Sequence, residues 1–283
     1  MKCQYLASAR AYLDTSGDLL LADEVRHALP FGIAETLAQN PHTYGQADPW
    51  FLVLKDGDDI CASAICTPPH QPILSHFAGE TAEVATALVS AIQELTKSIP
   101  GAVGEKALIE LFSGQWCSEF GAAVQSRMSQ RIYKMTQLVE PGLAPGKLRN
   151  ARIEEEDLIA RWTMGFQAEI SGEAPSHEQL ERCRQRITEG CIVVWDHDGP
   201  VSMALSTRPT KNGISIGGVY TPPELRKKGY ASSCVAMLCK RLLKAYDFCA
   251  LYTDLSNPTS NAIYKRIGFR EHCDSAQYSF KIS

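Results

Sequence analysis

The sequence predicts an α+β chain of two domains, and three features support this prediction. The first is a strand, turn, helix, strand and helix order over residues 214–269. The second is a hairpin pattern in residues 51–69 that recurs in residues 192–209. The third is a segment with two Pro-Gly pairs, typical of a linker, near residue 140. A length of 283 residues agrees with two domains of ordinary size.

Residues 1–139 are predicted to form the first domain, with 140–147 as the linker. Apolar residues at helical spacing indicate helices around residues 19–40. Two strands joined by the turn Lys55-Asp56-Gly57 should follow. These two strands are predicted at 50–54 and 60–67. After them we expect an apolar segment at 72–77, a helix at 82–97, and strand-like runs at 107–112 and 131–139.

The second domain is predicted to span residues 148–283. Its first helix should begin at the acidic run 154–157, because carboxylates favour the positive end of a helix dipole. A loop at 166–176, a helix at 177–189 and strands at 191–196 and 201–207 are expected to follow.

Composition and charge exclude several classes of protein. The net charge is −4 and no long basic run occurs, which argues against a nucleic-acid or membrane partner. The absence of a signal-like or membrane-spanning apolar run predicts a cytoplasmic protein. The ten cysteines include no C-x-x-C pair, so we expect reduced thiols and no metal site. The oligomeric state is left open.

The stretch from Ile214 to Phe269 carries the chemistry. Alternating residues predict a strand over 214–220, and the Gly217-Gly218 pair inside it suggests a bulge. A basic turn then opens a helix near Gly229-Tyr230-Ala231. The first turn of a helix has backbone N–H groups without intrahelical partners, and glycine lets an anion approach them closely. An anion site is therefore expected at this turn.

A second strand and a short helix complete the stretch. Residues 248–255 read as the strand, and Asn257-Pro258 as an N-cap followed by proline at the first helical position. Gly268 is placed to end this helix. One helical face would present the polar side chains of Asn257, Ser260, Asn261 and Tyr264.

Taken together, these residues resemble the GNAT superfamily of N-acetyltransferases. The matching pieces are Val219-Tyr220-Thr221, the Arg226-x-x-Gly229-x-Ala231 turn, and Asn257 seven residues before Tyr264. The resemblance implies two GNAT-like domains, each a mixed, mostly antiparallel twisted sheet flanked by helices. It also implies transfer of an acetyl group from acetyl-CoA to a primary amine of a small molecule or peptide.

The resemblance further assigns roles to residues. Tyr264 would protonate the departing thiolate, and a phenol suits that role chemically. Other residues would bind the pantetheine and pyrophosphate of acetyl-CoA: Val219, Tyr220, Thr221, Arg226, Lys227, Lys228, Gly229, Tyr230, Ala231, Ser232, Asn257 and Ser260. By the same resemblance, Glu169 and Glu173 are candidate contacts of the acceptor.

The first domain lacks the features of the basic turn at 226–231. Where the second half carries cations, the first carries Glu80 and Glu83, whose charge opposes a phosphate at a helix start. We therefore predict a degenerate domain without a cofactor turn.

The general base and two rival functions stay open. No acid occurs in residues 214–221, which leaves Glu169, Glu173, Asp254 or a bound water as the base. A CoA-binding or protein-interaction module without turnover is the main alternative. A serine hydrolase is suggested by Gly213-Ile-Ser215-Ile-Gly217 with Asp254 and His272, but the surrounding strand pattern opposes it.

Overall fold

The computed structural model describes residues 1–171 and 177–282. The chain forms two compact units. Unit 1 comprises Met1–Ile132, Thr253–Asn257 and His272–Ser283, and unit 2 comprises Tyr133–Tyr252 and Pro258–Glu271. Each unit thus contains more than one stretch of chain, unlike the contiguous domains expected from the sequence.

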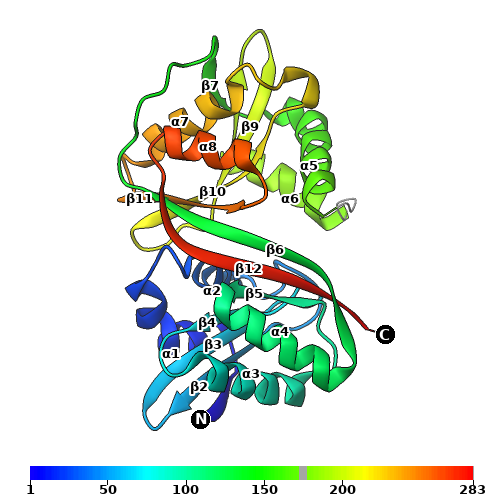
Figure 1. Ribbon diagram of the computed structural model, residues 1–283. Coiled ribbons are helices and arrows are strands. Elements are labelled where there is room, and N and C mark those ends of the chain that lie inside the picture. Colours follow the sequence, from blue (N-terminus) through cyan, green and yellow to red (C-terminus); the bar gives the residue numbers. More distant parts are fainter. Residues whose placement is uncertain (172–176, 283) are drawn as a thin grey trace. The chain divides into compact units, whose positions relative to one another are not determined.

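The order of the elements repeats along the chain (Figure 1). Each repeat runs strand, two helices, three strands, helix, strand, helix, strand. The first repeat holds β1 (Lys2–Leu6), α1 (Ala9–Ala22), α2 (Ala28–Gln39), β2 (Trp50–Asp56), β3 (Asp59–Cys66), β4 (Ile73–His76), α3 (Thr81–Leu95), β5 (Gly101–Glu105), α4 (Lys106–Phe120) and β6 (Ala122–Met135).

The second repeat contains the same kinds of element, with two short 3₁₀ turns, η1 and η2, added. Its elements are β7 (Lys147–Asn150), η1 (Ile153–Glu155), α5 (Glu156–Ser171), α6 (His177–Thr188), β8 (Ile192–Asp196), β9 (Pro200–Thr207), β10 (Gly213–Tyr220), η2 (Pro223–Leu225), α7 (Tyr230–Leu242), β11 (Phe248–Asp254), α8 (Pro258–Arg266) and β12 (Arg270–Ile282).

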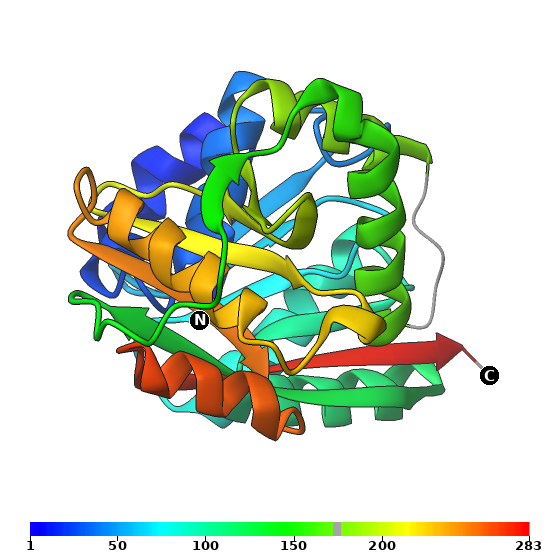
Figure 2. The same ribbon diagram turned by 90° about the horizontal axis from the view of Figure 1, so that it is seen from above.

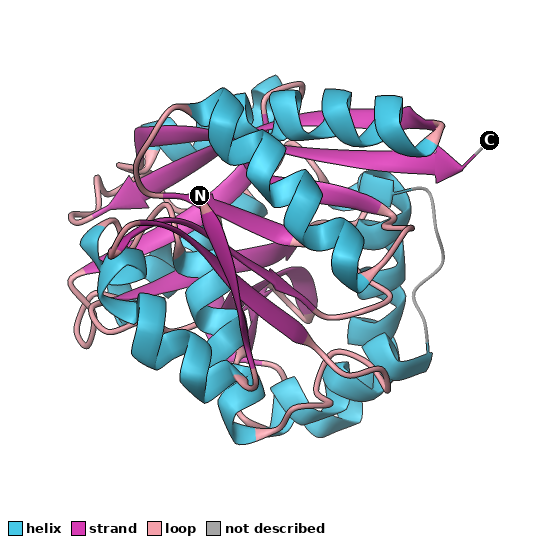
Figure 3. Ribbon diagram, turned by 90° about the horizontal axis from the view of Figure 1, so that it is seen from below, coloured by secondary structure: helices cyan, strands magenta, loops and turns pink. Residues whose placement is uncertain are grey.

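In unit 1 a sheet lies between two pairs of helices (Figure 3). Its strand order is β1-β2-β3-β4-β5-β12-β6. Because successive strand residues point to opposite faces, Phe51 packs with α1 and α2 while Leu52 packs with α3 and α4. Two apolar layers result, one on each face of the sheet.

The last strand of the chain belongs to unit 1. β12 pairs antiparallel with β5, in a register from Ser275 opposite Glu105 to Ser279 opposite Gly101. Its residues Ala276, Tyr278 and Phe280 are buried in the core formed with α3 and α4. The sheet of unit 1 is therefore completed by residues far away in the sequence.

Unit 2 is built in the same way, with β11-β10-β9-β8-β7 as its strand order. Val193 packs with α7 and α8 on one face, and its neighbour Val194 packs with α5 and α6 on the other. Figure 2 shows α5 and α7 on either side of these strands.

The sheets are mixed and mostly antiparallel, as expected. Among the described pairings, β4 with β5 and β10 with β11 are parallel, and each parallel pair is joined by a helix, α3 or α7. The remaining described pairings are antiparallel.

The helices expected around residues 19–40 are present as the end of α1 and as α2, with a break at residues 23–27. Two other element predictions are wrong. Residues 107–112 lie in α4, because their apolar side chains follow a helical period that a short window mistakes for a strand. The helix α5 continues to Ser171, so residues 166–171 are not a loop. The rest of that predicted loop, 172–176, lies outside the described residues.

Further expectations concern the thiols and membrane contact. All ten cysteines are free thiols, and six of them are buried, among them Cys61, Cys66 and Cys249. Cys191 is only half-buried. No helix in the described ranges has the length and apolar character needed to cross a membrane.

Candidate functional site

The strand β10 contains the predicted bulge. Its pairing with β9 shifts between Gly217, opposite Leu205, and Tyr220, opposite Met203, so one extra residue is accommodated. Gly218 lies in this shift with a φ of 55°, and a side-chain carbon there would come within 2.5 Å of Leu205. The left-handed φ favours glycine at this position, and a larger residue would also have to displace the Leu205 side chain. The bulge redirects the backbone of Val219 and Tyr220.

On its other edge, β10 pairs with β11 over only half its length. The parallel register runs from Gly213 opposite Phe248 to Ile216 opposite Leu251, and β10 continues to Tyr220. The backbone groups of residues 217–220 on that edge are therefore not used by β11. This is the place at which a substrate backbone or carbonyl could be held by strand N–H groups.

The turn that follows ends in two left-handed residues. After η2, Lys227 has a φ of 63° and Gly229, the N-cap of α7, has a φ of 81°. The first intrahelical bond of α7 runs from the Ser233 N–H to the Gly229 carbonyl. The N–H groups of residues 229–232 therefore lack intrahelical partners and point out of the helix start. This geometry suits an anion, and the left-handed conformation of Lys227, which is not a glycine, could not be predicted from the sequence.

The three cations of this turn differ in their surroundings. Lys227 and Lys228 are exposed. Arg226 instead donates from Nε to the carbonyl of Thr221 at 2.8 Å and forms an ion pair with Glu169. Its guanidinium lies 5.7 Å from the centre of the Tyr220 ring. Arg226 is exposed as well, but its guanidinium already has partners in Thr221, Glu169 and Tyr220.

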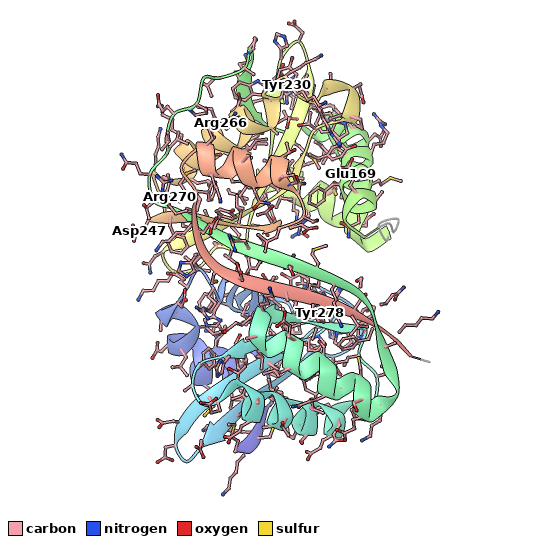
Figure 4. The ribbon with its side chains drawn as sticks, viewed as in Figure 1. Glu169, Tyr230, Asp247, Arg266, Arg270 and Tyr278 are labelled. Atoms are coloured by element: carbon pink, nitrogen blue, oxygen red, sulfur yellow. The ribbon has the colours of Figure 1, made fainter. Side chains whose placement is uncertain are left out.

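Among the first residues of α7, the backbone is available but the side chains are largely enclosed. Tyr230 is buried, with its ring 5.8 Å from His197. Ser232 is also buried, and its Oγ accepts a hydrogen bond of 3.5 Å from Arg266 of α8. Arg266 is a cation at this turn that sequence reasoning missed (Figure 4). The sequence position of Arg266, nine residues after Asn257, does not indicate this contact. Arg266 reaches the start of α7 because α8 packs against α7.

Tyr264, the predicted proton donor, lies in the core between α7, α8 and β11. Only 8% of it is exposed, and its ring packs edge-on against Phe269 at 5.9 Å. Burial, with a smaller effect of Cys239, raises the pKa of Tyr264 to about 12. Its hydroxyl makes no hydrogen bond to any residue that the structure describes. The phenol is therefore held protonated at neutral pH.

The other polar residues around α8 differ in their surroundings. Asn261 accepts a hydrogen bond from the buried Tyr133 hydroxyl at 3.0 Å, which makes it a structural contact. Asn257 precedes α8, is exposed, and is counted with unit 1. Ser260 is half-buried. Cofactor binding by Asn257 and Ser260 stays a prediction.

Of the two carboxylates predicted to contact the acceptor, one lies in the described residues. Glu169 lies near the end of α5 (Figure 4) and is exposed. The second candidate, Glu173, lies outside the described residues. Glu169 contacts the turn before α7 directly through Arg226, which its position in the sequence did not indicate.

The hydrolase arrangement is not formed. Ser215 is fully buried in the middle of β10, and its Oγ has no hydrogen-bond partner. His272 instead lies 2.7 Å from Asp23, within unit 1. A nucleophile elbow exposes its serine at a sharp strand-to-helix turn, and Ser215 has neither property. No cluster of potential metal ligands occurs in the described part of the chain.

Comparisons with known proteins agree with this architecture. The family model for FR47-like proteins matches residues 198–278, which hold the bulged strand, the turn and α8. A GNAT-family acetyltransferase from Colwellia psychrerythraea is 13% identical, with a TM-score of 0.58 over 99% of this chain and 100% of that one. A search of curated proteins found no match.

Two further solved structures are similar over almost the whole chain. A GCN5-related N-acetyltransferase from Sphaerobacter thermophilus is 16% identical, with a TM-score of 0.60 over 98% of this chain and 95% of that one. A tandem GNAT protein from the clavulanic acid biosynthesis pathway is 12% identical, with a TM-score of 0.56 over 99% and 97% of the two chains. The chain has the GNAT fold, and the resemblance predicted from the sequence is confirmed.

Proposed function

We propose that this chain, with its GNAT fold, is an N-acetyltransferase that moves an acetyl group from acetyl-CoA to a primary amine of a small molecule or peptide. The observation that carries the proposal lies in unit 2. A bulged strand with unused backbone groups leads, through a turn with two left-handed residues, to the unpaired N–H groups of a helix start. Cations flank that start, and a buried phenol lies on the neighbouring helix.

The first turn of α7 would hold the pyrophosphate. Its unpaired N–H groups and the helix dipole attract an anion, and Gly229 has no side chain to keep the anion away. Lys227 and Lys228 add positive charge from the turn, and Arg266 adds it from α8. The residues present therefore fit a phosphate-bearing carrier.

The strand β10 would support the reaction itself. The amine nitrogen forms a bond to the thioester carbonyl carbon, and the carbon–sulfur bond breaks, so that the sulfur leaves as a thiolate. Negative charge grows on the carbonyl oxygen meanwhile, and a preorganised N–H of Val219 or Tyr220 at the bulge would stabilise it. The nitrogen gives up a proton and the sulfur gains one.

Tyr264 would supply the proton to the sulfur. A phenol with a pKa of about 12 gives its proton to a thiolate of pKa near 8.5 only against a difference of about 5 kcal/mol. The apolar surroundings reduce that difference, because they disfavour the thiolate as well. Burial raises the pKa of Cys234, a thiol of the same core, to about 12. Proton transfer from Tyr264 to the sulfur then becomes less unfavourable than the values in water suggest.

The acceptor must lose a proton before it attacks, since an alkylamine with a pKa near 10.4 is protonated at neutral pH. No acid lies on β10, so the base must come from elsewhere or from water. Glu169 is the described carboxylate that contacts the turn. We assign it to the acceptor side.

Unit 1 would hold no CoA. Its helix α3 begins after Glu80 at the N-cap, with Glu83 in the first turn. His76 lies 3.1 Å from the carbonyls of both Ala78 and Gly79, so the loop before α3 is closed by its own contacts. Two carboxylates at a helix start repel a phosphate.

The direct test is the release of free CoA thiol from acetyl-CoA, followed over a panel of primary amines. Thiol release that requires an amine and yields the N-acetyl product supports the transferase. Tight CoA binding without release over the whole panel would instead support a binding module. Because the panel spans several kinds of primary amine, the natural acceptor need not be identified first.

A further inference from the structure

We propose that, in the free protein, the guanidinium of Arg226 occupies the site that receives the ammonium group of the acceptor. This site lies between the carboxylate of Glu169 and the ring of Tyr220. The inference rests on the proposed transferase function and deepens it. It identifies which groups recognise the amine and why the amine binds more tightly after the acyl carrier has bound.

The contacts of Arg226 show that a cation fits this place. Its guanidinium forms an ion pair with Glu169 and lies 5.7 Å from the centre of the Tyr220 ring. A carboxylate beside an aromatic face is the usual recognition set for an alkylammonium group. An ammonium on a flexible chain would find the same two partners.

The aromatic part of the site is rigid. Tyr220 is 9% exposed, and its ring lies 6.4 Å from that of Trp162 on α5. A side-chain carbon added at Gly165 would come within 2.4 Å of the Tyr220 hydroxyl. Tyr220 is therefore fixed between α5 and the turn, and Gly165 makes that close approach possible.

The cation in the site is displaceable. The side chains of Arg226 and Glu169 are 41% and 49% exposed, and ion pairs with that exposure are weak. The Nε of Arg226 donates to the Thr221 carbonyl at 2.8 Å, which tethers the group close to the turn. Rotation of the rest of the guanidinium frees Glu169 without moving the backbone.

The position of Arg226 in the chain explains how CoA binding would move its guanidinium away from Glu169. It lies three residues before Gly229, in the same turn as Lys227 and Lys228. A phosphate bound at the first turn of α7 attracts the guanidinium, and Glu169 and Tyr220 then become free for the acceptor. Because such coupling is reciprocal, each substrate strengthens binding of the other.

The test measures binding of n-butylammonium to the full chain by saturation-transfer NMR, with and without saturating CoA. n-Butanol serves as the neutral probe of equal length. For the unmodified protein we expect CoA to tighten n-butylammonium binding about tenfold. n-Butanol should not compete with it.

Variants separate the roles of the three residues. Arg226→Gln should bind n-butylammonium without CoA as tightly as the unmodified protein does with CoA, and CoA should add nothing. Glu169→Gln should lose n-butylammonium binding in both states while still binding CoA. Lys240→Gln removes another exposed cation that is paired with a carboxylate, Glu140, and should keep the coupling, which makes it the matched control.

Two results would overturn the inference. One is an Arg226→Gln variant that binds the amine no better than the unmodified protein without CoA. The other is unchanged amine binding in Glu169→Gln. Thiol release is measured on the same samples, so coupling without turnover would refute the transferase and leave the amine site standing. Turnover without coupling would refute only the amine site.

Discussion

At the scale of single residues, Tyr264 shows how burial changes what a side chain can do. A phenol in water has a pKa near 10, whereas burial raises the pKa of Tyr264 to about 12. The ring is fixed by Phe269 and by the core around α7. Its hydroxyl has no hydrogen bond in the described residues that would compete for a substrate atom.

Replacing Tyr264 by phenylalanine should reduce turnover much more than binding. The change removes one hydroxyl and keeps the ring that packs on Phe269, so the fold should persist. We expect kcat to fall about 10²-fold, the usual contribution of a positioned acid, with CoA affinity nearly unchanged. Steady-state thiol release and calorimetric CoA binding would show this. Equal turnover in the two proteins would remove Tyr264 from the reaction.

The pH dependence of turnover should show no loss on the alkaline side up to pH 10. The raised pKa of Tyr264 keeps the acid form, which is the donor, populated at about 99% at pH 10. The free amine meanwhile becomes more abundant as pH rises toward 10.4. A profile of kcat/KM from pH 7 to 10 should therefore rise throughout. A decline that disappears in Tyr264→Phe would contradict the raised pKa.

Gly229 allows charge to be separated from backbone strain. With a φ of 81°, any side chain there is strained, although the nearest atom, Cβ of Ala144, would be 3.6 Å away. Gly229→Asn and Gly229→Asp have nearly the same shape, and asparagine tolerates left-handed backbone. We expect Asp to weaken CoA binding at least tenfold more than Asn, because it places a carboxylate at the phosphate site. Equal affinities in calorimetry would argue against that site.

At the scale of elements, α3 and α7 occupy equivalent places in the two repeats and begin with opposite charge. The helix α7 starts after two exposed lysines and a glycine, and α3 starts after Glu80. Since the dipole is the same in both, the flanking charges decide which helix start accepts a phosphate. The fold is repeated, and the cationic helix start is not.

Exchange of Glu80 and Glu83 for glutamine should leave CoA affinity and stoichiometry unchanged. Both residues lie at the start of α3, which has no cationic turn. Calorimetry should still show one site per chain. The matched change in unit 2, Lys227 and Lys228 to glutamine, should weaken binding severalfold. A second CoA site in the variant with both glutamates replaced would mean that unit 1 has a CoA site whose binding the two carboxylates prevent.

At the scale of the whole molecule, the last strand makes unit 1 depend on the end of the chain. β12 completes the sheet beside β5 and places Tyr278 and Phe280 in the core with α3 and α4. Burying two large aromatic side chains contributes on the order of 3–6 kcal/mol. That is comparable to the entire net stability of an ordinary domain, about 5–15 kcal/mol.

Removing residues 272–283 should therefore unfold unit 1, although the motif stretch 214–269 stays intact. We expect rapid proteolysis within residues 1–132 and loss of the cooperative thermal transition of that unit. Tyr278→Ala together with Phe280→Ala should destabilise unit 1 in the same direction with the strand backbone kept. A truncated chain as protease-resistant as the full one would show that β12 is dispensable.

The sequence by itself determined the elements of unit 2 that lie around the site. The bulge at Gly217-Gly218, the helix start at Gly229 and the end of α8 at Gly268 were predicted because each needs a backbone conformation, or a close approach, that glycine allows. The fold class followed because alternation and helical spacing are local properties. The role of Tyr264 came only from family resemblance and stays a proposal.

Only the tertiary structure decided what lies beside what. The ion pair of Arg226 with Glu169, the contact of Arg266 with Ser232, and the membership of β12 in unit 1 join residues that are far apart in the sequence. The short-window prediction of a strand at 107–112 failed because an apolar run alone does not distinguish a buried helix from a strand. Spacing along a chain reports local backbone preference, whereas contacts between distant residues depend on how the helices pack on the sheet.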